Sequence, residues 1–149
     1  MIIDHWNQLK KYPLGKWIFS RLLRRMVPYS GTIYPAVDVL EPGYCRVIMR
    51  DRRIVRNHLN SIHAVALMNL GELSSGLAAT ASLSPKIRAI VVRFSIEFIK
   101  KARGTLVAEC HAKLPEVTGP IEHEVVVEVK DGTDTVVCRA KAVWLLDRR

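Results

Sequence analysis

The sequence predicts an α+β fold in which a curved antiparallel sheet wraps around one long buried helix. Residues 61–83 are rich in Ala, Leu and Met, which favour helix, and their apolar side chains fall on nearly every face. Two short alternating segments precede this stretch and four longer ones follow it. A helix that is apolar all round has to be covered on several sides, and a curved sheet does this.

The elements before the long helix are a basic arm and a hairpin. Residues 1–27 predict one or two helices split near Pro13. The segments 33–40 and 44–49 predict two strands joined by a turn at Glu41-Pro42-Gly43. Residues 50–60 are polar and basic and predict a loop.

The long helix and the strands after it complete the pattern. We expect Asn60 or Ser61 as the N-cap of the helix and Ser84-Pro85 as its end. Short turn signals separate the later strands, which should therefore be mostly antiparallel. These strands are predicted at residues 90–98, 106–114, 121–130 and 133–146.

This order of elements is typical of the hotdog fold, in which a curved antiparallel sheet wraps around one central helix. A chain of 149 residues leaves little room for two domains. We therefore predict a single hotdog domain over residues 1–149, with an N-terminal helical arm at 1–30 and the hotdog core at 31–149.

Composition and charge narrow the functional classes. Hydrophobic residues make up 49%, which excludes a disordered chain, and the net charge of +9 indicates an anionic partner. Nucleic acid is not predicted as this partner, because no nucleic-acid motif accompanies the charge. Three widely spaced cysteines without a CxxC exclude a full disulfide framework and favour a reduced, cytoplasmic setting. We expect neither a secretory signal nor an integral membrane segment.

Two features of the helix region are candidates for a catalytic or anion-binding site. Glu72 lies in a predicted buried helix, where an ionised carboxylate is costly unless it is paired or its pKa rises. Pairing with an arginine or reaching solvent is an equally good explanation of Glu72. The segment 57–63 holds two Asn and two His ahead of the helix, whose free N–H groups and dipole stabilise an anion. An ordinary capped helix with surface histidines explains this segment as well.

The residues at these positions resemble a family motif. Asn57, five residues, His63-Ala64-Val65, six residues and Glu72 match the spacing of hotdog-fold acyl-CoA thioesterases of the phenylacetate-degradation type. That family has Asn, five residues, His-Gly-Gly, six residues and Asp or Glu. With Ala64 and Val65 in place of the glycines, the chain is most similar to a poorly characterised bacterial thioesterase-like branch. The resemblance covers nearly all of residues 30–147.

The resemblance implies a role for each motif residue. Glu72 would activate water as general base or attack the thioester as nucleophile, and the N–H of Ala64 would hold the oxyanion. Asn57 would position the water or the carbonyl, and His63 would orient the loop or hydrogen-bond near the carbonyl. The substrate would be an acyl-CoA or another acyl thioester, with coenzyme A as part of the substrate and no separate cofactor.

Helix geometry adds a constraint on assembly. His63 and Glu72 are nine residues apart, which is about 13 Å along one helix. One site that uses both residues must therefore combine two chains, as in the hotdog thioesterases. We expect a homodimer or a dimer of dimers.

Basic residues beside the motif are candidates for binding the phosphates of coenzyme A, although plain solubility explains each of them singly. These candidates are Arg56, Lys100, Lys101 and Arg103. A metal site is not predicted, because the histidines lack HExxH spacing and no cysteine lies beside them.

Other functions remain as alternatives. A non-catalytic acyl-CoA or lipid-binding hotdog module is the main one. A thioester hydratase or dehydratase is a weaker alternative, because it needs an acid–base pair with a His in a motif that is not found.

The basic arm also allows two interpretations. It could lie on an anionic membrane surface, or its apolar side could pack over the open end of the hotdog and cover the acyl pocket. We expect the second, with little vesicle binding at physiological salt, because Trp17, Phe19 and Leu23 spread widely around the helix.

Overall fold

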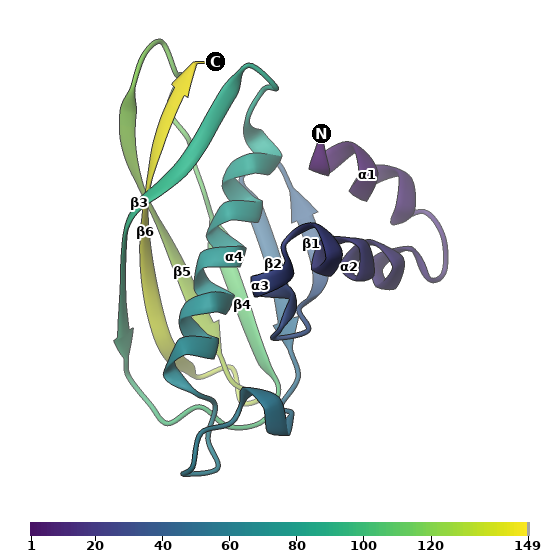
Figure 1. Cartoon of the computed structure of the whole chain (residues 1–149), viewed down its shortest axis with the longest axis vertical. Helices are drawn as coiled ribbons and strands as arrows, with labels where there is room; N and C mark the ends of the chain where they lie inside the picture. The colour runs from purple at the N-terminus through teal and green to yellow at the C-terminus, as the bar shows by residue number, and fades with distance from the viewer. Residues whose placement is uncertain (149) are drawn as a thin grey trace.

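The computed structural model describes residues 1–148, in which helices precede and then lie against an antiparallel sheet (Figure 1). The helices are α1 (Ile2–Leu9), α2 (Gly15–Met26), α3 (Pro28–Gly31) and α4 (Ala64–Ser82), with a 3₁₀ turn η1 (Arg53–Val55) before α4. The strands are β1 (Ala36–Glu41), β2 (Tyr44–Met49), β3 (Ile87–Phe98), β4 (Leu106–His111), β5 (Ile121–Lys130) and β6 (Val136–Arg148).

The sheet has the order β1-β2-β4-β5-β6-β3, and every neighbouring pair is antiparallel. Helix α4 contacts all six strands and lies along the concave side of the sheet (Figure 1). This arrangement is the hotdog fold that the sequence predicts.

The strands are antiparallel as predicted, but their order in the sheet is not their order in the sequence. Strand β3 pairs with β6 and not with β4, the next strand along the chain. The chain therefore crosses from one edge of the sheet to its middle between Phe98 and Leu106. Side-chain alternation tells which face of a strand is buried but not which strand lies beside it. As a result β3 forms an edge of the sheet.

The start of α4 also differs from the prediction. The helix begins at Ala64 and its N-cap is His63, so neither Asn60 nor Ser61 caps it. Asn60 has a positive φ of 54° and belongs to a tight loop that precedes the helix. Asn and Ser are both good N-cap residues, but here Asn60 and Ser61 belong to the turn that Asn57 closes, and the helix begins after that turn.

Helix α4 is less completely buried than its composition suggested. Val65 is 48% exposed and Met68 is 37% exposed, while Glu72 and Gly76 are half-buried. These positions are spaced by three and four residues, so they form one stripe along the helix. The stripe is the least buried side of α4, and Glu72 and Gly76 line a cavity there together with residues of β3 and β6.

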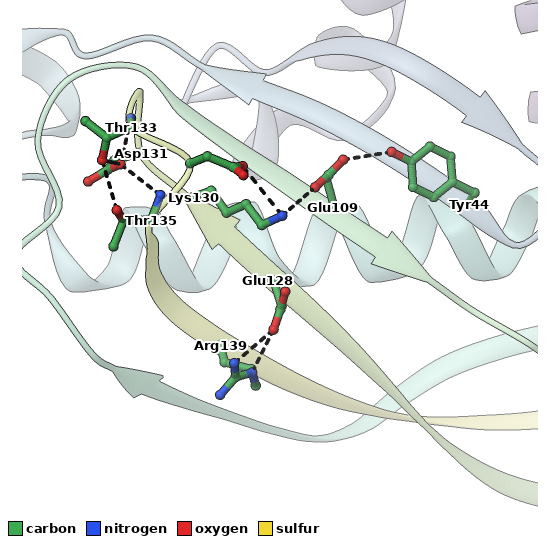
Figure 2. Close-up of polar contacts among 9 residues, drawn as sticks. Tyr44, Glu109, Glu128, Lys130, Asp131, Thr133, Thr135 and Arg139 are labelled. Carbon is green, nitrogen blue, oxygen red and sulfur yellow. Dashed lines mark hydrogen bonds and ion pairs between the residues drawn. The ribbon is translucent and has the colours of Figure 1, made fainter.

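The outer face of the sheet is polar. Tyr44 on β2 donates a hydrogen bond to Glu109 on β4 (2.9 Å), and Lys130 on β5 contacts the other oxygen of Glu109 (3.2 Å) (Figure 2). Burial and the contact with Glu109 raise the pKa of Tyr44 to about 12. A further pair joins Glu128 to Arg139 across β5 and β6. The apolar side chains of these strands point the other way and form the core with α4.

The cysteines are part of this core. Cys45 and Cys110 lie opposite each other on β2 and β4, Cys138 lies on β6, and all three are buried and free. Burial raises the pKa of each thiol, to about 12 for Cys110 and Cys138. A protonated, buried thiol is a poor nucleophile, so these residues serve packing.

The N-terminal arm consists of α1 and α2, split near Pro13 as predicted, followed by the short α3. The rings of Trp6 and Phe19 meet edge to face at 5.1 Å and join α1 to α2. Gly15 permits this contact, because a Cβ there would lie 1.6 Å from the carbonyl oxygen of Leu9. The arm packs beside β1 and α4 (Figure 1). None of the helices within residues 1–148 combines the length and the apolar character needed to cross a membrane.

Candidate active site

His63 organises the start of α4. Its Nδ1 atom accepts a hydrogen bond from the N–H of Val65 (3.1 Å), and its own backbone N–H donates to the carbonyl of Val55 (2.8 Å). The side chain of His63 therefore caps the start of α4. This geometry fits the loop-orienting role that the family resemblance implies for His63.

Asn57 organises the loop before the helix. Its Oδ1 accepts hydrogen bonds from the N–H of Leu59 (2.9 Å) and the N–H of Ser61 (3.2 Å), and its Nδ2 lies 3.0 Å from the hydroxyl of Ser61. The backbone N–H of Asn57 donates to the carbonyl of Ser61 (2.8 Å). The side chain therefore closes a compact turn, and the role of Asn57 in positioning water or substrate stays a prediction.

Ala64 is the first residue of α4, and it is exposed. Within residues 1–148 its backbone N–H has no hydrogen-bond acceptor, whereas the next N–H, of Val65, is taken by His63. A free donor at the positive end of a 19-residue helix dipole suits an oxyanion. The predicted role of Ala64 therefore has a suitable donor, which needs no glycine.

Glu72 lies eight residues after Ala64, about two turns further along α4, and is half-buried. In the described part of the chain its carboxylate makes neither an ion pair nor a hydrogen bond, so the pairing with an arginine that the sequence left open does not occur there. Burial raises the pKa of Glu72 above its ordinary value of 4.5. An unpaired acid with a raised pKa is typical of a general base.

Glu72 lines a cavity of about 820 Å³ that lies between α4, the arm and β3. This volume lies within the range of small-molecule sites. Met1, Ile2, Leu23 and Val27 of the arm form part of its lining, while the expectation that the arm covers an acyl pocket stays a prediction.

Trp144 on β6 also lines this cavity. Its Nε1–H donates to the hydroxyl of Ser75 (3.2 Å), which in turn donates to the backbone carbonyl of Glu72 (2.8 Å). The indole packs against Gly76, where an added Cβ would lie 3.2 Å from the Trp144 ring. Gly76 therefore sets how close the ring lies to the helix and how much space is left beside Glu72.

The structure does not bring all the motif residues together within one chain. His63 lines a different, smaller cavity of about 190 Å³ at the start of α4, whereas Glu72 lines the larger one. The two residues lie on one helix about 13 Å apart along its axis. A larger hollow of about 970 Å³ lies at the far end of α4 beside Tyr44 and His111 and contains no motif residue.

Asn69 is a site residue to which the sequence assigned no role. It is 8% exposed and lines the smaller cavity with His63. Its Nδ2 donates to the carbonyl of Tyr29 (3.3 Å), but its Oδ1 has no partner in the described chain. A buried acceptor without a donor costs stability, and such groups often mark a place where a ligand or water binds. The only sequence signal was a polar residue in an apolar helix.

The candidate phosphate-binding residues lie near the start of α4. The N–H of Ile62 donates to the carbonyl of Ala102 (2.8 Å), which ties the segment that carries Lys101 and Arg103 to the loop before the helix. Asp51 holds Arg56 at 2.6 Å and also accepts from the N–H of Gly104 (3.0 Å).

The cations of this group differ in their partners. Lys100 pairs with Asp131 (2.8 Å) and Arg56 pairs with Asp51. Lys101 and Arg103 have no carboxylate partner within residues 1–148. The last two are therefore the more available for an anionic ligand.

Comparison with known families settles the relationship. A family described as "Domain of unknown function (DUF4442)" matches residues 15–146. The chain belongs to this family. No curated protein matches the chain at a significant level.

Solved structures of similar fold include several named as thioesterases. A crystal structure of the genomics protein APC5556 has 28% identity and a TM-score of 0.84, with 99% of each chain covered. PA5026 from Pseudomonas aeruginosa, described as of unknown function and a probable thioesterase, has 24% identity and a TM-score of 0.79, with 87% of this chain and 93% of that chain covered.

A third structure carries a ligand. The protein smu.793 from Streptococcus mutans, solved bound to acetyl CoA, has 20% identity and a TM-score of 0.66, with 76% of this chain and 89% of that chain covered. These likenesses confirm the hotdog fold, which this chain shares with a protein described as a probable thioesterase and with one solved bound to acetyl CoA.

Proposed function

We propose that this protein is an acyl-CoA thioesterase, with Glu72 as its general base or nucleophile. The observation that carries this proposal is the unpaired, half-buried Glu72 carboxylate on the wall of a cavity of about 820 Å³. The motif spacing, and the solved structures of the same fold that are named as thioesterases or hold acetyl CoA, support it.

In the proposed reaction, Glu72 takes a proton from a water molecule as the water oxygen attacks the thioester carbonyl carbon. The negative charge that develops on the carbonyl oxygen is stabilised by the free N–H of Ala64 and the α4 dipole. The carbon–sulfur bond then breaks, and the thiolate of coenzyme A leaves and takes up a proton. Direct attack by the Glu72 carboxylate, followed by hydrolysis of the resulting anhydride, uses the same residues.

The proposed enzyme is a homodimer in which one protomer supplies Glu72 and its partner supplies the helix start. Edge strand β3 supports this assembly, because it is twelve residues long and exposes Ile90, Val92 and Phe98. A long apolar edge is normally covered by another strand. Residues 87–90 of β3 also line the Glu72 cavity, so a second copy bound at this edge would approach that cavity.

Coenzyme A would place its phosphates near Lys101 and Arg103, with Arg56 and Lys100 at the margin. The backbone hydrogen bond from Ile62 to Ala102 supports this assignment. It holds the segment with Lys101 and Arg103 beside the start of α4, where the thioester carbonyl would bind. Arginine is well suited to phosphate because its guanidinium forms two parallel hydrogen bonds.

The test is a hydrolysis screen across acyl-CoA chain lengths, followed by release of the coenzyme A thiol, with direct binding of the same ligands measured in parallel. Turnover by the wild-type protein that depends on chain length supports the thioesterase. Binding without turnover would instead support the non-catalytic acyl-CoA-binding module.

A further inference from the structure

The outer face of α2 combines large apolar side chains with arginines. Phe19 and Leu23 point inward and are buried. Trp17 is 57% exposed, so the expectation that it packs in the core is wrong. The exposed apolar residues of this helix are Trp17, Ile18, Leu22 and Met26. Arg21 and Arg25 fall between them at 100° per residue, and the helix contains no acidic residue.

The cations of the arm are mostly free of carboxylates. Lys16 pairs with Asp38 at 2.9 Å and the N-terminal ammonium pairs with Asp4, but the other lysines and arginines of residues 1–27 have no acidic side-chain partner in the described chain. The guanidinium of Arg21 instead lies over the Trp17 ring at 5.6 Å. Cation–π contact leaves the N–H donors of a guanidinium free at their edges.

A basic hollow adjoins this face. It has a volume of about 340 Å³ and lies between α2 and the strands β1 and β2. Its charged and aromatic lining consists of Lys16, Arg24, Arg50, Arg52, Trp17 and Tyr34, together with one acid, Asp38.

The arginines of the hollow are held in place without carboxylates. The guanidinium groups of Arg24 and Arg52 lie 5.1 and 4.8 Å from the centre of the same Tyr34 ring. Asp38 does not neutralise them, because Lys16 and Arg46 are its ion-pair partners. A hollow with two free guanidinium groups matches the chemistry of a phosphate ester.

We propose that the outer face of α2 and the adjoining basic hollow form a docking surface for an anionic phospholipid membrane. Arg24 and Arg52 bind the phosphates of lipid headgroups, while Trp17, Leu22 and Met26 enter the boundary between headgroups and acyl chains. A helix that lies in the membrane plane needs both parts, a basic rim and apolar side chains that leave water. Nucleic acid fits less well, because contacts to its sugar-phosphate backbone are made by polar and charged groups and would leave Leu22 and Met26 exposed.

The position of this surface is compatible with the rest of the protein. The arm lies beside β1, at the opposite edge of the sheet from β3 (Figure 1). Pairing of two copies through β3 therefore leaves it open. The inner side of the same arm lines the Glu72 cavity, so docking brings that cavity close to the lipid. The proposal does not depend on hydrolysis.

The experiment is sedimentation of the full chain with vesicles at 0.15 M salt. One set contains phosphatidylcholine alone, and the other contains phosphatidylcholine with 30% phosphatidylglycerol. Because Trp17, Leu22 and Met26 are exposed, the proposal reverses the expectation from the sequence of little vesicle binding. We expect at least tenfold stronger binding to the anionic vesicles. The pair Arg24→Gln and Arg52→Gln should weaken this binding about tenfold or more, since each cation near an anionic surface contributes substantially. The pair Leu22→Ser and Met26→Ser should weaken it as well.

The matched control is the pair Lys113→Gln and Lys141→Gln, which removes the same charge from exposed positions away from the arm. It should bind as the wild type does. Absence of binding to anionic vesicles, or equal loss in the control pair, would overturn the proposal. So would a change in oligomeric state for the Leu22→Ser and Met26→Ser pair without any vesicle binding, because this face would then be an interface between copies. Circular dichroism of each variant establishes that it is folded.

Discussion

Substitution of Ala64 by proline removes one backbone donor from the proposed site with little other change. Ala64 is the first residue of α4, the helix position at which proline is most favoured. Its N–H has no acceptor in the described chain, so folding loses no hydrogen bond there. The preceding residue, His63, has φ −64° and ψ 139°, the extended conformation that a residue before proline prefers.

The expected effects on stability and on catalysis have different sizes. A proline at a compatible position stabilises a protein by about 0.4–1 kcal/mol, because it restricts the unfolded chain. For a chain of this length the Tm should rise by about 1–4 °C. Loss of an oxyanion donor lowers kcat by about 10²–10³. We therefore expect a protein that is slightly more stable and nearly inactive.

The assay is release of the coenzyme A thiol from the preferred acyl-CoA, combined with a thermal melt. Ala64→Ser is the matched control, since it changes the side chain but keeps the N–H, and its kcat should stay within a fewfold of wild type. A folded Ala64→Pro protein with wild-type kcat would refute the oxyanion role of the α4 N-terminus.

Three further predictions follow from the site. Because burial raises the pKa of Glu72, activity should be lost on the acid side at a pH above 4.5. The free energy of unfolding should decrease as the pH rises from 4.5 through the pKa of Glu72 in the folded protein, because the unfolded chain gives up this proton first. That loss, measured by urea unfolding, should be absent in Glu72→Gln; an identical pH dependence in the two proteins contradicts this. Mixing inactive Asn57→Ala and Glu72→Gln chains should restore about a quarter of wild-type activity, since about half the dimers are mixed and each holds one intact site of two. No recovery despite proven exchange argues for a site within one chain. Gly76→Ala should push the Trp144 ring into the cavity at a net cost of about 0–2 kcal/mol and shift the preference toward shorter acyl chains, and an unchanged chain-length profile contradicts this.

Much of the fold is predictable because local patterns report burial directly. The strands at 44–49 and 121–130 agree with their predicted bounds, since alternation and turn residues agree there. The position of β3 in the sheet could not be predicted. Its neighbour β6 begins 38 residues later in the sequence than the end of β3 at Phe98, and no local pattern reports such a pairing.

The candidate site was predictable as a spacing of residues but not as a set of contacts. The sequence singled out Glu72, and only the structure shows that this carboxylate is unpaired and lines a cavity. His63 as the helix cap, and Asn57 as the centre of a turn, depend on how the loop folds against Val55 and Ala102. The exposure of Trp17 was missed because helical spacing gives the angles between side chains but not which angle faces the core.

The most direct measurement of the central proposal is kcat for the best acyl-CoA substrate in wild type and in Glu72→Gln. The amide has nearly the size of the carboxylate and cannot accept the proton of water, so kcat should fall by about 10²–10⁴. Affinity for the substrate and cooperative unfolding should be kept, because the Glu72 carboxylate makes no ion pair within residues 1–148. A folded Glu72→Gln protein that binds substrate and turns it over at the wild-type rate would contradict the account.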